Sequence, residues 1–426
     1  MIAAQNLLPR PLLLTAVLAG LLALAACAPR EAEKKPDALT LTPLAFSALP
    51  GWLDDDQSAA LPALRKSCAY FARQSDATRL QPAPTDSQAP GLGGPGIGGY
   101  VGDWRAVCAA ASQLPDGNPA AARAFFEREF KPFKAANNRD TQGLFTGYYE
   151  AELRGAKQPT GRYKVPLYKV PGDLVAVDLA EFGSEFSGRT IAGKVVQGKL
   201  RPYDDRATIE RGSLKGKNLE LLWVDDAIDA FFLHIQGSGR VVMDDGTVLR
   251  VGYAGKNGQP YVAIGRELVT RGVMKPEEVS MQGLRAWLKA NPREAEPLMN
   301  ANRSYVFFQE TKGAGPHEGP IGAQTVALTP GRSLAVDRKF LPLGLPIWLD
   351  ASHPDGAANS SSGEARIRRL VVAQDTGGAI RGPVRGDVFF GWGEQAAARA
   401  GAMRDRGEYY LLLPNAVAAR NALPTS

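Results

Sequence analysis

The chain has 426 residues, of which 44% are hydrophobic and 22% are charged, and its formal net charge is +6. A chain of this length is expected to form about two to three domains with substantial cores. The charge is mild for this size, and no run of Lys and Arg with interleaved aromatic residues is found, so nucleic acid is not an expected partner.

The first thirty residues have the pattern of a bacterial export signal. Arg10 precedes the apolar run Pro11–Leu22, and two alanines then lead to Cys27. An apolar segment of this length before small residues predicts a cleaved secretory signal and not a permanent membrane span. Similarity to a lipobox implies that residues 1–27 hold the signal peptide and lipobox and that Cys27 carries a lipid. A signal peptide with an incidental cysteine is the alternative.

The residues after Cys27 favour a tether and an address on the outer membrane. Residues 28–40 are polar and contain two prolines, which predicts a linker between lipid and fold. Ala28 stands where an aspartate would favour retention in the inner membrane. We therefore expect the protein on the periplasmic face of the outer membrane, anchored through Cys27.

Two further cysteines, Cys68 and Cys108, remain after the anchor. In an oxidising periplasm, such a pair is more typical of a disulfide than of two free thiols. The disulfide would close a loop of about 40 residues and stabilise the fold by roughly 3–4 kcal/mol in the chain-entropy model.

Short runs of β-forming residues dominate the chain from Leu144 onward. Before them, the Pro- and Gly-rich residues 82–99 predict a surface loop, and Asn118-Pro119 predicts the start of a helix. The expected strands are Leu144–Leu153, Tyr163–Val170, Leu219–Val224, Phe231–Gln236, Val241–Val242, Tyr305–Gln309, Gln324–Leu328, Leu345–Leu349, Ile367–Ala373 and Val388–Gly391. Helices are expected at Tyr261–Arg271 and Met281–Asn291. The pattern predicts a mainly β protein with peripheral helices, in two barrel-like lobes.

Metal catalysis and serine hydrolysis have weak support in the sequence. His234, His317 and His353 are widely separated and lack the spacing of metal ligands, although a site made of carboxylates alone stays open. The run Gln236–Gly239 comes closest to a nucleophile elbow, but a glycine turn between strands is the better interpretation. We expect no metal and no cofactor.

Three aspartates in the last 90 residues indicate a catalytic cleft. Asp375-Thr376-Gly377 resembles half of an aspartic protease site, but a protease needs two such turns and the chain has one. A tight turn capped by Asp375 is the alternative. Asp387 and Asp337 also adjoin strand-like apolar runs, where a carboxylate is costly unless it has a partner or a function. Their common environment suggests that the three converge.

Several longer motifs occur between residues 120 and 415. They are Phe145–Glu150, Ala230–Gly239, Gly252–Gly258, Ser280–Leu284, Ser304–Phe308, Leu328–Asp337 and the block Asp375–Asp387. In sequence and order they resemble the membrane-bound lytic murein transglycosylase A family, whose C-terminal domain is named for three aspartates. The loop at 91–99 and the segment 350–366 depart from the family pattern and look like insertions.

The resemblance implies both a fold and a reaction. Residues 41–147 and 301–426 would form a double-psi β-barrel catalytic domain, and residues 148–300 an inserted second β-barrel-like domain on the other side of a glycan groove. The substrate would be the β-1,4 bond between N-acetylmuramate and N-acetylglucosamine in peptidoglycan. Cleavage would consume no water and leave 1,6-anhydromuramate ends. Proteins of cell-wall synthesis and remodelling are candidate partners.

One carboxyl group can perform this reaction because the substrate supplies its own nucleophile, whereas a hydrolytic glycosidase normally needs two. The resemblance assigns the acid/base role to Asp387, and supporting positions to Asp375 and Asp337. Asp387 would have to be protonated near neutral pH, although a free Asp titrates at about 3.9. We expect Phe389, Phe390 and a nearby Asp375 to raise its pKa.

Polar and aromatic residues of the motifs are the candidates for holding the sugars. They are Thr146, Gly147, Tyr148, Tyr149, Gln236, Ser238, Tyr305, Thr376 and Gly377. Packing in the core is the alternative for Tyr148 and Tyr149, and a turn role is the alternative for Gln236.

Two other functions stay open from the sequence. The first is a hydrolytic glycosidase, in which Asp337 or Asp375 activates water at roughly 6.5–9.5 Å from the acid. The second is a non-catalytic lipoprotein that binds peptidoglycan, whose binding would survive loss of Asp387.

Overall fold

The computed structural model describes residues 35–80, 96–186, 189–311, 315–352 and 366–421. Contacts divide the chain into two units, Met1–Asp37 and Ala38–Ser426. The predicted signal peptide, Cys27 and most of the tether lie outside the described residues, as do most of the loop at 82–99 and of the segment 350–366. Within the described ranges, no helix is both long and apolar enough to cross a membrane.

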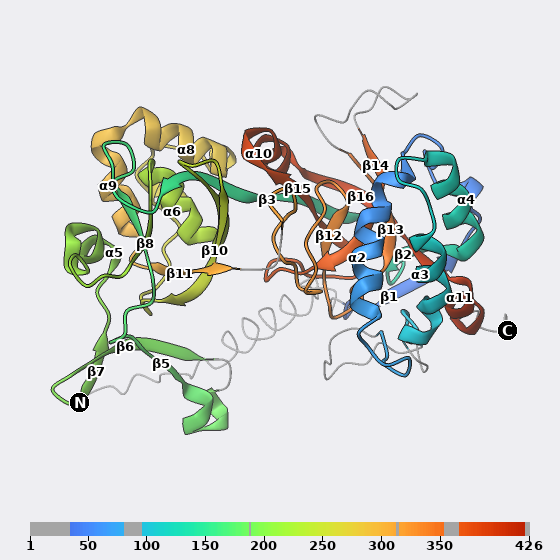
Figure 1. Ribbon diagram of the computed structural model, residues 1–426, viewed down its shortest axis with the longest axis horizontal. Helices are drawn as coiled ribbons and strands as arrows, with labels where there is room; N and C mark the ends of the chain where they lie inside the picture. Colours follow the sequence, from blue (N-terminus) through green and yellow to red (C-terminus); the bar gives the residue numbers. More distant parts are fainter. Residues whose placement is uncertain (1–34, 81–95, 187–188, 312–314, 353–365, 422–426) are drawn as a thin grey trace, which may run out of the picture. The chain divides into compact units, whose positions relative to one another are not determined.

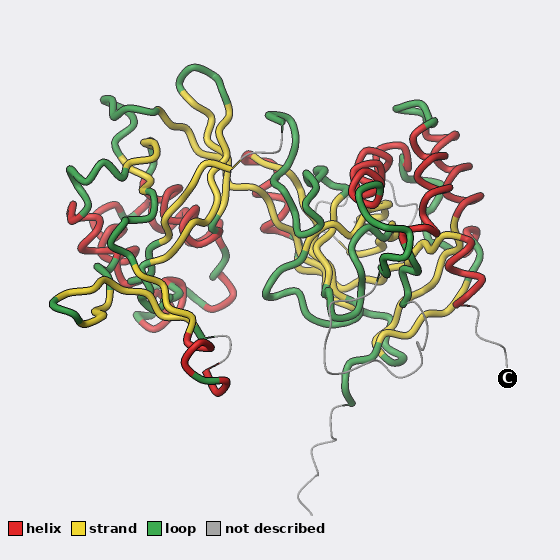
Figure 2. Tube along the Cα trace, turned by 60° about the horizontal axis from the view of Figure 1, so that its bottom comes forward, coloured by secondary structure: helices red, strands yellow, loops and turns green. Residues whose placement is uncertain are grey.

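The second unit is mainly β sheet with helices beside it (Figures 1 and 2). A 13-stranded sheet has the order β1-β2-β16-β13-β14-β12-β15-β3-β9-β10-β11, with β8 pairing with β3 and β4, and a smaller sheet has the order β5-β6-β7. The strands are β1 Leu39–Pro43, β2 Phe130–Asn137, β3 Gly143–Ala156, β4 Val165–Tyr168, β5 Val175–Asp178, β6 Thr190–Val196, β7 Lys199–Pro202, β8 Glu220–Val224, β9 Ser238–Met243, β10 Val248–Lys256, β11 Val306–Thr311, β12 Ser333–Val336, β13 Pro346–Ser352, β14 Arg366–Asp375, β15 Arg385–Trp392 and β16 Arg404–Pro414.

Helices connect and flank these strands. They are α2 Leu61–Phe71, α3 Arg105–Ser112, α4 Pro119–Glu129, α5 Arg206–Thr208, α6 Ala227–Gln236, α7 Ile264–Thr270, α8 Met281–Ala290, α9 Pro292–Ala301, α10 Gly393–Ala402 and α11 Asn415–Asn421. Side chains cap two of the helices that the sequence predicts: Asn118 accepts from Ala121 N at the start of α4, and Ser280 accepts from Gly283 N at the start of α8, both at 3.0 Å.

Strand β3 links two groups of strands (Figure 1). Residues 143–150 pair with β15 or β16, and residues 151–156 pair with β9 or β8. The buried side chains follow the same division. One core cluster combines residues from 39–145 and 334–418, whereas three others contain only residues from 151–308. The catalytic aspartates predicted from the sequence therefore belong to strands or turns of the first group.

The predicted strand Phe231–Gln236 is wrong, because these residues form the second half of helix α6. Asp226 begins the helix by accepting from Ile228 N and Asp229 N, and Gly237, with φ 78°, ends it. Ala230–His234 are all buried, so the segment lacks the apolar-polar alternation that separates a strand from a buried helix. Gly237 therefore joins a helix to a strand, and the predicted turn between two strands is also wrong.

The predicted strand Gln324–Leu328 is also wrong, since only an isolated bridge joins Ile321 and Ala327. Thr325 has φ 60°, in the left-handed region, which interrupts extended backbone. Val326, Ala327 and Leu328 are nevertheless buried. The apolar run therefore reflects burial of a turn and not of a strand.

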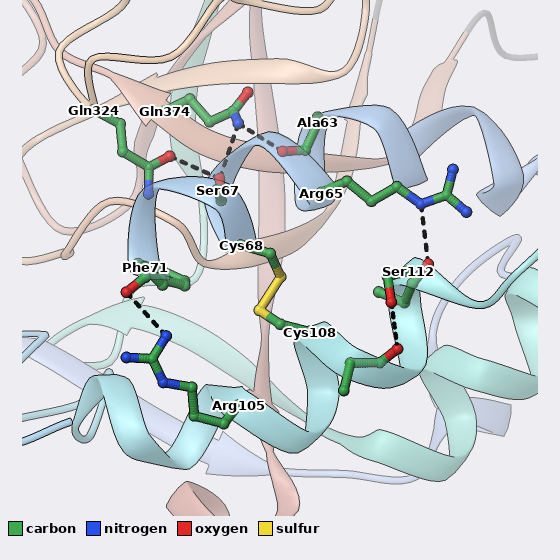
Figure 3. Close-up of a disulfide and its surroundings, with 12 residues drawn as sticks. Ala63, Arg65, Ser67, Cys68, Phe71, Arg105, Cys108, Ser112, Gln324 and Gln374 are labelled. Atoms are coloured by element: carbon green, nitrogen blue, oxygen red, sulfur yellow. Dashed lines mark hydrogen bonds between the residues drawn. A yellow bond between two sulfur atoms is a disulfide. The ribbon is translucent and has the colours of Figure 1, made fainter. Parts of the chain in front are cut away.

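A disulfide joins α2 to α3 through Cys68 and Cys108 (Figure 3), with Cα atoms 5.4 Å apart. Beside it, Ser67 donates to Gln324 Oε1 at 2.7 Å and accepts from Gln374 Nε2 at 2.9 Å. These contacts fasten α2 to the end of β14 and to the turn before β12. The disulfide thus ties α3 to α2, the helix that packs against β14.

Candidate active site

Asp387 lies on β15, between β12 and β3 in the sheet. It is in register with Ala335 of β12 on one side and with Thr146 of β3 on the other. Ala335 is in register with Asp375 on its other side. In-register residues of neighbouring strands project from the same face of a sheet. The strand order therefore places Thr146, Asp387 and Asp375 in one row, with the small side chain of Ala335 between the two aspartates.

Thr146 and Arg385 both act on the Asp387 carboxyl group. Thr146 Oγ1 donates to Asp387 Oδ1 at 2.7 Å, and the same Oγ1 accepts from Arg385 Nη2 at 2.8 Å. The guanidinium also donates to Leu144 O at 3.2 Å, and Arg385 as a whole is 9% exposed. Because arginine can only donate, its bond to Thr146 directs the threonine proton toward Asp387. Asp387 Oδ1 is thereby held as an acceptor.

The environment raises the pKa of Asp387 above the ordinary value of an aspartate. Burial is the largest cause, and the negative charge of Asp375 acts in the same direction; the bond from Thr146 and the charge of Arg385 oppose them. The next two residues, Val388 and Phe389, are fully buried. The direction is the one that a general acid requires, since a carboxyl group must hold its proton in order to donate it.

Asp375 is held by groups on two other segments. Tyr148 Oη donates to Asp375 Oδ2 at 2.7 Å, and Ala323 N donates to Asp375 Oδ1 at 3.0 Å. Burial raises the pKa of Tyr148 well above its usual value, and the charges of Asp375 and Asp387 raise it further, so the phenol keeps its proton and remains a donor. Its ring packs 5.3 Å from that of Phe389. Both carboxylate oxygens of Asp375 are therefore engaged as acceptors.

Asp337 follows β12 and holds a loop. Its carboxylate accepts from Lys339 N at 3.0 Å and from Gly382 N at 2.8 Å. Thr376 Oγ1 donates to Val336 O at 2.9 Å, and Gly377 O accepts from Ile380 N at 3.0 Å. Asp337 and Thr376 thus fasten the loop after Asp375 to the end of β12.

Other residues predicted to bind sugar lie further along β3 and beyond it. Tyr149 Oη donates to the sulfur of Met281 at 2.9 Å, and Gln236 Nε2 lies 3.9 Å from the same sulfur. Ser238 is exposed at the start of β9. Tyr305 is 3% exposed, and its ring lies 4.1 Å from that of His234. Gln236, Ser238 and Tyr305 lie within residues 151–308, the lobe that contains α6, and Tyr149 reaches Met281 of this lobe from the preceding part of β3.

Gly147 has a packing role that its position on β3 explains. A Cβ atom there would lie 2.6 Å from the ring of Phe390 and 2.8 Å from the Cα atom of Ala400 on α10. Any side chain would push α10 away from β3. The glycine therefore lets a helix approach the strand that carries Thr146 and Tyr148.

Comparisons with known proteins follow the same division of the chain. Residues 144–309 match the family model of the MltA specific insert domain, and residues 332–413 match that of the 3D domain. Membrane-bound lytic murein transglycosylase A of Vibrio cholerae is 33% identical over 277 residues, which are 64% of this chain and 66% of the relative.

Solved structures extend the similarity over most of the described fold. The lytic transglycosylase LtgG of Burkholderia pseudomallei is 40% identical, with a TM-score of 0.64 and coverage of 89% of this chain and 98% of that one. MltA from Neisseria gonorrhoeae is 31% identical, with a TM-score of 0.71 and coverage of 89% and 92%. The chain belongs to the membrane-bound lytic murein transglycosylase A family. It spans just under two thirds of the curated relatives from Vibrio cholerae and Escherichia coli strain K12, at 66% and 65% of their lengths.

In this member of the lytic murein transglycosylase A family, the sequence interpretation missed Arg385 and Met281. Arg385 precedes Asp387 by two residues, and residues two apart on a strand share a face, so a signal for it was present. Met281 begins a helix distant in the chain from both Tyr149 and Gln236, and no local pattern predicts that these three residues meet.

Proposed function

We propose that the protein is a lytic transglycosylase that cleaves the β-1,4 bond between N-acetylmuramate and N-acetylglucosamine in peptidoglycan and leaves 1,6-anhydromuramate ends. Family membership supports the reaction class. The observation that carries the proposal is the Asp387 carboxyl group, whose pKa burial raises and which accepts a bond from Thr146. A protonated, positioned carboxyl group can act as a general acid.

In the first step, Asp387 protonates the glycosidic oxygen. The bond between C1 of N-acetylmuramate and this oxygen breaks, and N-acetylglucosamine leaves as an alcohol. Because Thr146 donates to Oδ1 at 2.7 Å, the transferred proton belongs to Oδ2. The bond from Thr146 and the charge of Arg385 then stabilise the carboxylate that remains.

In the second step, the Asp387 carboxylate removes the proton from the C6 hydroxyl of the same N-acetylmuramate. The C6 oxygen bonds to C1 and closes the 1,6-anhydro ring. Asp387 ends the cycle protonated, and no water is consumed. The N-acetyl group stabilises the positive charge that develops at C1 between the two steps.

Asp375 supports this cycle without transferring a proton itself. Both of its oxygens accept hydrogen bonds, from Tyr148 and from Ala323 N, and these bonds fix the orientation of the carboxylate. The charge of Asp375 opposes ionisation of Asp387. Asp337 holds the loop that follows Asp375 by accepting a hydrogen bond from Gly382 N.

We further propose that the sugars contact residues on both sides of this row. Thr146, Tyr148, Thr376 and Gly377 would lie at the cleaved bond, and Gly147 would let α10 approach the strand between them. Tyr149, Gln236 and Ser238 would contact more distant sugars, with Tyr305 packed beneath them. Tyrosine rings offer apolar faces to sugar C–H groups, and amides and hydroxyls pair with sugar hydroxyls.

The fold that we propose is a double-psi β-barrel from residues 41–147 and 301–426, with a second barrel-like domain inserted at 148–300. The ring of pairings β16-β13-β14-β12-β15-β3, in which β3 also pairs with β16, supports closure of six strands. The separate core clusters support the division into domains.

We also propose that residues 1–27 are a lipoprotein signal, that Cys27 anchors the protein on the periplasmic face of the outer membrane, and that residues 28–40 tether it there. Peptidoglycan glycan strands are the proposed substrate, and proteins of cell-wall synthesis and remodelling are candidate partners. The curated relatives are named membrane-bound, which supports an envelope location.

Mass analysis of the products from purified sacculi tests the reaction. A transglycosylase produces anhydro ends, each lighter by one water than the reducing end that a hydrolase produces. Products with reducing ends alone would show a hydrolytic glycosidase, and binding without any soluble product would show a non-catalytic lipoprotein.

A further inference from the structure

A cavity of about 500 Å³ lies in the lobe that contains α6, away from the aspartates. It is lined by the last turn of α6, the start of β9, Tyr253 of β10, Tyr261 and the segment before β11. The polar and aromatic residues of the lining include His234, Gln236, Ser238, Tyr253, Tyr261 and Ser304. Among the described residues, none with a formal charge at neutral pH belongs to the lining. The cavity therefore fits an uncharged ligand.

His234 gives this cavity a defined hydrogen-bond donor. The side chain is only 6% exposed, and its Nδ1 accepts from Val306 N at 3.2 Å. Burial lowers the pKa of His234 well below its usual value, and the nearby Arg206 charge lowers it further, so the ring is neutral. A neutral ring whose Nδ1 accepts must carry its proton on Nε2. Nε2 has no hydrogen-bond partner among the described residues.

The remaining groups around the cavity are typical of sugar recognition. Tyr253 and Tyr261 are 52% and 58% exposed and offer ring faces. Ser238 and Ser304 contribute hydroxyl groups. Gln236 Oε1 is buried without a partner, so its amide gains a hydrogen bond if it turns toward a ligand N–H. A ligand that offers a carbonyl oxygen to His234 and an N–H to Gln236 contains a secondary amide.

The cavity lies some distance from Asp387 along β3. Thr146 is in register with Asp387, and Ala151 is in register with Gly239, the residue after Ser238. Five residues of extended strand span about 17 Å. One sugar cannot occupy both places, so a ligand that reaches both must be an oligosaccharide.

We propose that this cavity binds the acetamido group of an N-acetylated sugar distant from the cleaved bond, with His234 Nε2–H donating to its carbonyl oxygen and Gln236 accepting from its N–H. The inference rests on the proposed function only in taking the glycan strand as the source of the amide. A peptide bond of the peptidoglycan stem offers the same chemistry, and the experiment separates the two sources.

The experiment measures binding to the full mature chain by calorimetry, with matched substitutions of His234. Asparagine reproduces the acceptor at Nδ1 but has no donor at Nε2, whereas glutamine places a donor near Nε2. The ligands are the β-1,4-linked hexamer of N-acetylglucosamine, the hexamer of glucose, which lacks acetamido groups, and a sugar-free acetylated dipeptide amide. His317→Asn serves as a control on an exposed histidine.

We expect His234→Asn to weaken binding of the N-acetylated hexamer about tenfold or more, the scale of a lost hydrogen bond to a buried group. His234→Gln should stay within about threefold of the wild type, and His317→Asn should not differ from it. The glucose hexamer should bind the wild type at least tenfold more weakly. Unfolding temperatures establish that each variant is folded, and the comparison of ligands on the wild type needs no variant.

Unchanged binding by folded His234→Asn, or equal binding of the glucose hexamer, would overturn the proposal. Binding of the dipeptide amide without binding of the N-acetylated hexamer would overturn the sugar as the source. If the protein releases anhydro ends but His234→Asn does not change its binding, the proposed function stands and only the cavity assignment is wrong. Binding that depends on His234 without any release of anhydro ends would contradict the reaction and leave the cavity assignment intact.

Discussion

Thr146 Oγ1 and Asp387 Oδ1 lie 2.7 Å apart although 241 residues separate them in the chain. The parallel pairing of β3 with β15 brings them together, and Arg385 fixes the direction of the threonine proton. The proposed acid is therefore one member of a hydrogen-bonded set. Burial raises its pKa, and the bond from Thr146 and the charge of Arg385 oppose that rise.

Asp387→Asn should abolish most of the activity. Asparagine keeps the shape of the side chain but cannot donate and recover a proton, so release of anhydro ends from sacculi should fall by a factor of about 10²–10⁴. Binding to insoluble murein should survive. Because the folded state raises the pKa of Asp387, stability associated with this group is lost as pH rises through that pKa; above it, the variant should be at least as stable as the wild type. Near-normal activity would refute the assignment.

Arg385→Met should move the alkaline limb of the pH profile to higher pH. The acid must be protonated, so activity falls as pH rises through the pKa of Asp387, and the charge of Arg385 lowers that pKa. Its removal raises the pKa. Arg385→Lys, which keeps the charge, should restore the limb toward the wild-type position. Arg381→Met, at an exposed arginine near Asp337, is the control. If the alkaline limb of folded Arg385→Met lies at the same pH as that of the wild type, Arg385 does not lower the pKa of Asp387.

Tyr148→Phe should reduce the rate roughly tenfold, the effect of losing one hydrogen bond to a carboxylate. The phenol donates to Asp375 Oδ2, and without it, Ala323 N is the one remaining donor to this carboxylate in the part of the chain that the structure describes. Tyr410→Phe removes the same kind of bond, to Glu408 at 2.8 Å on β16, and should leave the rate unchanged. Equal rates for the two variants would argue against a role of Asp375 in the reaction.

Replacing Cys68 and Cys108 by serine should lower the free energy of unfolding by about 4 kcal/mol, the chain-entropy value for a loop of this size. The cysteines lie 40 residues apart, and the bond joins α2 to α3. Denaturant titration measures the change. A reductant should destabilise the wild type by a similar amount and leave the double variant unaffected; a reductant effect on both would mean that another group is responsible.

Cys27→Ser should abolish lipidation, because the lipid of a bacterial lipoprotein is attached to the cysteine sulfur. Metabolic labelling with a fatty-acid analogue measures it, and fractionation should find the variant released from the membrane. Cys68→Ser provides a control with one cysteine fewer and an intact anchor. Labelling that persists in Cys27→Ser would contradict the lipoprotein interpretation.

The lobe that contains α6 limits what could be predicted from local sequence. Ala230–His234 are all buried, so the apolar run is compatible with a strand and with a buried helix. The sequence pattern favoured the strand, whereas the structure has a helix. The starts of two helices were predicted correctly, because Asn118 and Ser280 cap them through hydrogen bonds within one turn. Capping depends on residues within one turn, whereas the choice for α6 depends on which surfaces cover it.

The sequence alone determined the motifs of the family, the pairing of the two remaining cysteines and the apolar neighbours of Asp387, because each is a property of adjacent residues or of a count. Only the tertiary structure decided that Thr146 and Arg385 meet at Asp387, that Tyr148 donates to Asp375 across 227 residues, and that His234 lines a cavity. The physical reason is strand register. A shift of one residue in the pairing of β3 with β15 would turn Thr146 to the opposite face, and no local pattern fixes a pairing between segments so far apart.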